Sequence, residues 1–257
     1  MPDSLATLPH AHDADSTTAT ELIVAWQNPH TRAIRPVGRL TSDGPDYVFS
    51  YLSSAPEVAG FRPIIGFPHF HRAYRSPTLF PVFSQRLMSA TRPDFAWYSD
   101  ILGLPVDAAP LTVLGRSTGR REGDSLMFIP NPPVAPDGKS TSTFFVHGLR
   151  HVAHAEAHLA LCAEGDAATL RAEPDNPVNP RALLVISDAG HRIGWVPDLL
   201  LDYVHAMREH SSPRVAIAQI NPPTAPPNLR LRITIHGAVT PGFEMFGSPT
   251  AGVAARG

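Results

Sequence analysis

The chain has 257 residues, of which 43% are hydrophobic and 17% charged, so it can bury the core of a globular protein. Its formal net charge of −2 argues against strong non-specific binding to phosphate backbones, and no stretch is apolar enough to span a membrane. Residues 1–20 lack the basic start and apolar segment of a secretion signal, and Cys162 is the single cysteine. We therefore expect a cytoplasmic protein without an internal disulfide.

Residues 1–20 are polar and aperiodic, which predicts a disordered tail. Residues 21–130 predict a small mixed β/α domain. Its expected strands cover 22–26, 34–40, 47–52 and 125–129, and its expected short helices cover 83–88, 94–102 and 111–114. Between them, residues 56–82 are dense in Pro, Phe and Gly, and we expect an ordered loop whose aromatic side chains cover a core.

Residues 131–142 (NPPVAPDGKSTS) predict a linker because they are rich in Pro, Ser and Gly. The following segment, 143–236, predicts a small β-barrel with two helices. Its expected strands start at 144 and cover 168–172, 182–187, 191–196, 214–220 and 229–235, and its expected helices cover 154–162 and 198–208. We expect residues 237–257 to form a C-terminal tail, and the fold class to be α+β.

Four motifs in the second half resemble a HIRAN domain in order and spacing. They are HGLR at 147–150, LRAEPDNP at 170–177, RALLV at 181–185 and IGWVP at 193–197. The resemblance implies an OB-like β-barrel with helices packed against it. It also implies nucleic-acid binding, because in fork-remodelling ATPases this domain grips the 3′ end of single-stranded DNA.

Carried over to this sequence, the resemblance implies a binding site on one face of the barrel. Its expected residues are Arg150, His151, Arg171, Asn176, Asn179 and Trp195. Two positions depart from the family pattern, since Val178 stands in place of a tyrosine and Asn179 in place of an aspartate. Val178 cannot stack a base, and Asn179 accepts a terminal hydroxyl less strongly than a carboxylate. The alternative interpretation is that Asn176 and Asn179 shape a turn and that Trp195 is half-buried core.

The first half resembles, more loosely, the small N-terminal subdomain of HipA-type kinases. The matching segments are VGRL at 37–40, YVFSY at 47–51, IIGFP at 64–68, FPVFSQRLM at 80–88 and GRREGD at 119–124. The kinase core does not follow, because the sequence has neither the catalytic-loop Asp and Asn nor a magnesium-binding motif. We expect a scaffold or a module that binds a protein partner.

The loop GRSTGRREGD at 115–124 predicts a flexible hairpin, and its Arg116, Arg120 and Arg121 are candidates for holding an anion. It lacks the Gly-Lys-Ser/Thr ending of a P-loop. His147, His151, His154 and His158 recur at helical spacing but fall across a strand end and a turn, so we expect no metal site. No Gly-x-Ser-x-Gly motif is present, and we expect neither enzymatic activity nor a cofactor.

The leading hypothesis is a non-catalytic protein of bacterial type that contacts single-stranded DNA or DNA ends through the HIRAN-like module. The alternative is a regulatory subunit that docks a protein partner, such as a HipA-like kinase or DNA-processing machinery, without binding DNA itself. The small net charge favours this alternative.

Overall fold

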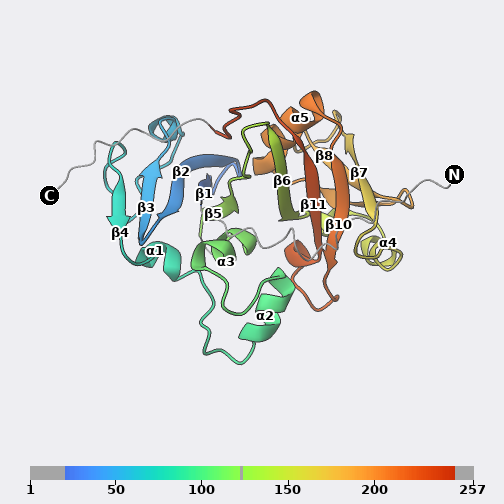
Figure 1. Ribbon diagram of the computed structural model, residues 1–257, viewed down its shortest axis with the longest axis horizontal. Coiled ribbons are helices and arrows are strands. Elements are labelled where there is room, and N and C mark those ends of the chain that lie inside the picture. Colours follow the sequence, from blue (N-terminus) through green and yellow to red (C-terminus); the bar gives the residue numbers. More distant parts are fainter. Residues whose placement is uncertain (1–20, 122–123, 247–257) are drawn as a thin grey trace.

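In the computed structural model, which describes residues 21–121 and 124–246, two antiparallel sheets lie side by side (Figure 1). The first sheet has five strands in the order β4-β3-β2-β1-β5. Its strands are β1 (Glu21–Gln27), β2 (Ile34–Asp43), β3 (Asp46–Tyr51), β4 (Tyr74–Ser76) and β5 (Leu126–Pro130). The second sheet has six strands in the order β6-β11-β10-β7-β8-β9. Its strands are β6 (Lys139–Phe145), β7 (Ala167–Ala172), β8 (Leu183–Ser187), β9 (Arg192–Trp195), β10 (Arg214–Ile220) and β11 (Leu231–Ala238). The mixed α and antiparallel β architecture agrees with the predicted class.

The first sheet packs one face on an aromatic cluster. Phe49 lies at its centre, with ring centroids 4.5 Å from Phe67 and 5.4 Å from Phe83. The helical segments of this half are η1 (Ala55–Glu57), α1 (Pro81–Ser84), α2 (Phe95–Leu102) and α3 (Pro110–Arg116). As expected, loop 56–82 supplies aromatic rings to this core. Helix α1 is shorter than the predicted 83–88, and it starts at Pro81, which the first turn of a helix tolerates.

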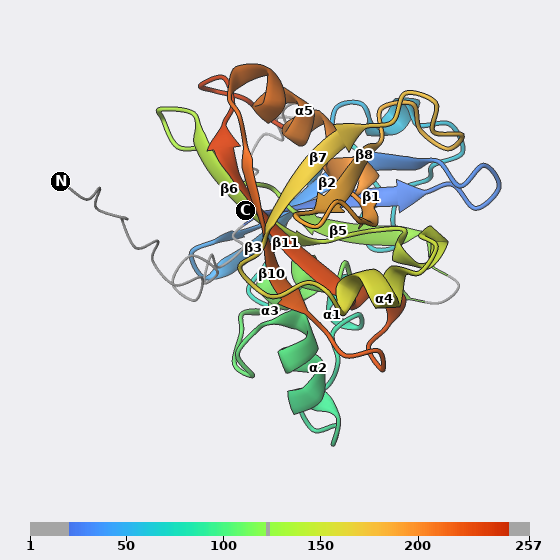
Figure 2. The same cartoon turned by 90° about the vertical axis from the view of Figure 1, so that its right-hand side faces the viewer.

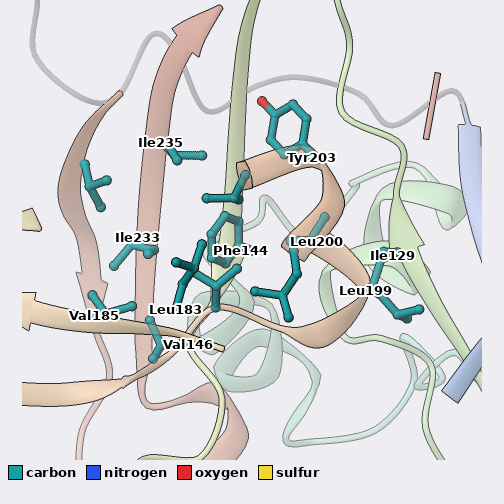
Figure 3. Close-up of a cluster of buried hydrophobic side chains, with 14 of the residues drawn as sticks. Ile129, Phe144, Val146, Leu183, Val185, Leu199, Leu200, Tyr203, Ile233 and Ile235 are labelled. Atoms are coloured by element: carbon teal, nitrogen blue, oxygen red, sulfur yellow. The ribbon is translucent and has the colours of Figure 1, made fainter. Parts of the chain in front are cut away.

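Strand β1 is buried on both faces because it separates two cores. Successive side chains of a strand point to opposite faces. Leu22 and Val24 therefore pack into the aromatic cluster, while Ile23 and Ala25 pack into the core of the second sheet. Strand β5 divides its residues in the same way, and the second-sheet core includes Ile129 (Figure 3).

The second sheet curls until its two outer strands meet. His147, just after β6, and Trp195 in β9 exchange two backbone hydrogen bonds of 2.9 Å. This bridge links the first and last strands and gives the sheet the character of a small barrel, as predicted. The barrel interior holds Phe144, Val146, Leu183, Val185 and Ile233 (Figure 3).

Five helical segments accompany the barrel: η2 (Leu149–His151), α4 (Ala155–Leu159), η3 (Asp198–Leu200), α5 (Leu201–His210) and η4 (Pro227–Leu229). Helix α5 buries Tyr203, whose hydroxyl is hydrogen-bonded to Ser140 Oγ at 2.7 Å. Helix α4 is shorter than the predicted 154–162. No helix in the described part of the chain is long and apolar enough to cross a membrane.

Strand pairing extends beyond the predicted ends of the barrel segment. Residues 139–142, expected in a linker, belong to β6, and Lys139 pairs with Ala238 of β11. Ala238 itself lies in the segment expected to be a tail. The polar residues Lys-Ser-Thr-Ser at 139–142 have the composition of a linker, yet their backbone N–H and C=O groups form hydrogen bonds with the neighbouring strand β11. Residues 1–20 and 247–257, the remaining predicted tails, lie outside the described residues.

The first half also contacts the barrel through α2. The Asn221 side chain donates to the Ile101 carbonyl at 2.7 Å, and the Gln219 side chain donates to the Asp100 carbonyl at 2.9 Å. Ile101 and Leu102 share a small buried cluster with Phe145 of β6. The expected domain boundary is therefore crossed by buried side chains.

Candidate nucleic-acid interface

The candidate interface is organised around a β-bulge in β9. Leu184 pairs with Trp195 and Ile186 with Arg192. The paired positions are three residues apart in β9 but only two apart in β8, so β9 contains one extra residue. Gly194 sits in the bulge with φ +115°, and a Cβ there would lie 2.4 Å from Val146 Cγ1. Because an extra residue reverses the alternation of side chains, Arg192 and Trp195 emerge on the same face of the sheet.

The Trp195 side chain is held on three sides. Its ring covers Gly148, where an added Cβ would lie 2.7 Å from Trp195 Cε3. Its indole N–H donates to Glu173 Oε2 at 2.6 Å. The Arg192 guanidinium carbon stands over the ring, 5.6 Å from its centroid. The ring is thus half-buried and closes the barrel, as the alternative interpretation expected.

Glu173 is the acceptor at the centre of this arrangement. In addition to the hydrogen bond from Trp195, its carboxylate accepts one from Asn176 Nδ2 at 3.2 Å and one from the Arg192 side chain at 2.7 Å. Partial burial would raise the pKa of Glu173, but the hydrogen bonds from Trp195 and Asn176, together with the charges of Arg192 and Arg171, hold it below its ordinary value. We call Glu173, Asn176, Arg192 and Trp195 the Trp195 cluster.

Arg171 lies in the same row of the sheet as Trp195. Leu184 of β8 pairs with Arg171 on one side and with Trp195 on the other. Residues that are directly paired on neighbouring strands point to the same face of a sheet. On this face Arg171 is exposed, while Leu184 between it and Trp195 is fully buried. The structure therefore brings two of the predicted site residues to one face of the β7–β8–β9 sheet.

Arg150 and His151 lie in the η2 turn, which follows Gly148. Both are exposed, and Arg150 Nε donates to His151 Nε2 at 3.0 Å. Since the Trp195 ring covers Gly148, the pair projects beside the closing bridge of the barrel. Among residues 21–121 and 124–246, no carboxylate forms a salt bridge with Arg150 or His151.

Asn176 and Asn179 have their amide groups engaged within the chain. Asn176 Oδ1 accepts the backbone N–H groups of Val178 and Asn179, at 3.0 and 3.2 Å. The Asn179 side chain accepts the Arg181 backbone N–H at 3.0 Å and donates to Asp198 at 3.1 Å. These contacts are those of residues that shape a turn.

The three arginines predicted for an anion-holding loop are separated by the fold. Arg116 lies in α3 and is buried, with 9% of its surface exposed. It belongs to the helix because α3 continues past the predicted end at Leu114, and its role as an anion ligand stays a prediction. Arg120 and Arg121 are exposed in the turn that follows. Residues 122–123 of the loop lie outside the described residues.

The histidines near α4 come together without forming a chelating set. The His158 and His191 rings stack with centroids 4.4 Å apart, and His158 Nδ1 lies 3.2 Å from the Arg192 carbonyl oxygen. Within the described ranges, no group of three or more His, Cys, Asp or Glu side chains is arranged to hold a metal ion.

Sequence reasoning missed Glu173, Arg192 and His147 as members of this region. Glu173 and His147 stand inside the motifs at 170–177 and 147–150, so their positions were visible but their roles were not. Arg192 precedes the IGWVP motif directly. Strict alternation places it on the face opposite to Trp195, and only the bulge at Gly194 reverses this.

No protein-family model matches this chain, and no curated protein matches it. Two solved structures are similar to part of it. A protein from Lactobacillus plantarum has 17% identity and a TM-score of 0.31, with 39% of this chain and 99% of that chain covered. The HIRAN domain of human HLTF has 16% identity and a TM-score of 0.26, with 39% of this chain and 77% of that chain covered. Similarity at this level assigns no function to this chain.

Proposed function

We propose that this protein is a non-catalytic nucleic-acid-binding protein that contacts single-stranded DNA or DNA ends through the barrel. The observation that carries the proposal is the exposed Arg150–His151 pair beside the barrel's closing bridge. An arginine that has no carboxylate partner retains the donors and the charge that a phosphate requires.

The fixed position of η2 supports this role. Leu149, the first residue of η2, is buried in the barrel core, and Gly148 is covered by the Trp195 ring. The Arg150 guanidinium is thereby presented on a rigid support, which reduces the entropy that binding would cost. Arg171, exposed on β7, adds a further positive charge on the Trp195 side.

The Trp195 ring contributes mainly to the shape of this surface. One part of it covers Gly148, and Arg192 stands over it. A base that stacks here meets the Arg192 guanidinium plane or displaces it. We therefore expect phosphate contacts to dominate the affinity, which makes binding strongly dependent on salt.

The test is fluorescence anisotropy with labelled single-stranded oligonucleotides at two salt concentrations. Oligonucleotides with free and with blocked 3′ ends distinguish end capture from contact along the strand. We expect Arg150→Ala to weaken binding. The matched control is Arg208→Ala, because Arg208 is exposed on α5 and has no ion-pair partner among the described residues. Absence of wild-type binding at low salt would contradict the proposal.

The second candidate is a partner-docking protein. The small net charge of −2 favours it, and Ile65 and Val178, which are 90% and 87% exposed, are apolar side chains available to a partner. Under this hypothesis, the purified protein binds no oligonucleotide, and a HipA-like kinase or another partner binds the chain in a manner sensitive to Ile65→Ser or Val178→Ser. Binding of oligonucleotides that is lost with Arg150→Ala would contradict it.

A further inference from the structure

The turn after α3 contacts the end of β1 through Arg120. Arg120 donates to Gln27 Oε1 at 3.3 Å, at the end of β1, and the Gln27 backbone N–H donates to the Ser125 carbonyl at 2.7 Å. The β1–β2 turn and the chain entering β5 lie on the same side of the molecule, on the right of Figure 2. Ile34, which pairs with Gln27 in the β1–β2 ladder, packs against the barrel core, so the Arg120–Gln27 contact lies at the edge where the first sheet meets the barrel.

His147 brings the barrel to the same edge. Its backbone forms the bridge with Trp195, and its side chain remains accessible to solvent. Neighbouring protein groups displace part of the water around the ring and so lower the pKa of His147. The carboxylate of Asp198 acts against this, and the charge of Arg120 lowers the pKa further. Arg120 is thus within electrostatic reach of a residue that lies three positions before Arg150.

The charge of Arg120 is not neutralised by a carboxylate in the described ranges. Gln27, its hydrogen-bond acceptor, is a neutral amide. The nearest acidic residue along the described sequence, Asp124, accepts Arg86 and the Leu126 backbone N–H instead. Since a guanidinium has five N–H donors, Arg120 has donors left for a ligand.

We propose that a nucleic-acid strand held at Arg150 continues along this edge to Arg120, so that the first sheet supplies a second phosphate contact. This inference rests on the proposed function, because it extends the same site. It assigns a nucleic-acid contact to the half of the chain that was expected to be a scaffold or a module that binds a protein partner. We call Arg120, His147, Arg150 and His151 the arginine edge.

If the strand runs from Arg150 to Arg120, the loss of affinity caused by substituting Arg120 should depend on the length of the oligonucleotide. Single-stranded DNA of about four nucleotides fills one contact region, whereas about twelve nucleotides reach both. We expect Arg120→Gln to weaken binding of the longer oligonucleotide by about fivefold to tenfold and to reduce its salt slope by about 0.7. Binding of the shorter one stays within about twofold of wild type. Arg150→Ala weakens both.

The controls separate failure of this inference from failure of the proposed function. If wild type binds neither oligonucleotide, the proposed function fails, and the inference fails with it. If wild type binds both and Arg120→Gln binds the longer one equally well, or loses both equally, only the inference is overturned. Arg208→Ala controls for the loss of one positive charge, and thermal unfolding confirms that the Arg120→Gln variant is folded. Arg121→Gln repeats the test at the neighbouring exposed arginine.

Discussion

The Trp195 cluster and the arginine edge lie close together but use their polar groups in opposite ways. In the Trp195 cluster, Glu173 accepts the donors of Trp195, Asn176 and Arg192, so the charges compensate one another. At the arginine edge, Arg120 donates to a neutral amide and Arg150 to an imidazole. Proximity in the fold therefore does not give these residues one role.

The difference separates stability from binding. A buried or half-buried polar group costs free energy unless it is paired, and so the paired groups of the Trp195 cluster stabilise the closing bridge. An exposed arginine without a carboxylate contributes little to folding, yet its charge is available to a phosphate. Substitutions in the two regions should therefore have opposite consequences.

The largest effect is expected for Gly194→Ala, which would break the bulge that supports the Trp195 cluster. The new Cβ would meet Val146 Cγ1 at 2.4 Å and the His147 carbonyl oxygen at 2.7 Å, at a φ of +115°. We expect a loss of about 3 kcal/mol or more in the free energy of unfolding, measured by urea denaturation. Gly190→Ala is the control, because its φ is +82° but the space around it is open. Its loss should be about 1 kcal/mol. Equal losses would show that the bulge packing is unimportant.

A smaller and pH-dependent effect is expected for Glu173→Gln. We expect a loss of about 1–2 kcal/mol at neutral pH, because the carboxylate accepts charge-assisted hydrogen bonds. The folded pKa of Glu173 lies below its ordinary value of 4.5, so its stabilisation is complete above that pH. It is lost as the pH falls through the folded pKa. Urea unfolding at neutral and acid pH should thus show the two proteins converging in acid. A difference that is independent of pH would contradict this, and Glu209→Gln is the control, because Glu209 is exposed near the end of α5.

At the arginine edge, Arg150→Ala should change binding and leave stability unaltered. We expect about tenfold weaker binding of single-stranded DNA, or about 1.4 kcal/mol, with the free energy of unfolding within about 0.5 kcal/mol of wild type. Arg192→Ala is the contrasting variant, because Arg192 pairs with Glu173 and covers the Trp195 ring. It should lose stability with little loss of binding. If Arg150→Ala lost stability and Arg192→Ala lost DNA binding, the proposed distinction between the two regions would be wrong.

The smallest effect is expected for Val178→Ser. Val178 is 87% exposed in a turn held by Asn176, so the free energy of unfolding should stay within about 0.5 kcal/mol of wild type. DNA binding by anisotropy should also be unchanged, because the side chain can neither pair with a phosphate nor stack a base. Weaker DNA binding by this variant would extend the interface into the turn.

Several elements were predictable because they depend on local patterns. Strand β10 has the bounds that alternation predicted, 214–220, and the Asn-Pro turn forms where its composition placed it. The linker prediction failed over 139–142, because composition does not reveal a neighbouring strand that satisfies backbone groups. Arg150 and His151 are exposed, and their binding role stays a prediction, whereas the burial of Arg116 could not be predicted from its loop-like sequence.

The sequence by itself determined the α+β class, the order of most strands and helices, and the residue types from which a phosphate-binding surface can be built. These follow from periodicity and turn chemistry, which act over a few residues. Only the tertiary structure decided that β1 serves two cores, that Arg192 covers Trp195, and that Arg120 contacts the end of β1. Each of these depends on contacts between segments distant in the chain, or on a single inserted residue that reverses the side-chain alternation.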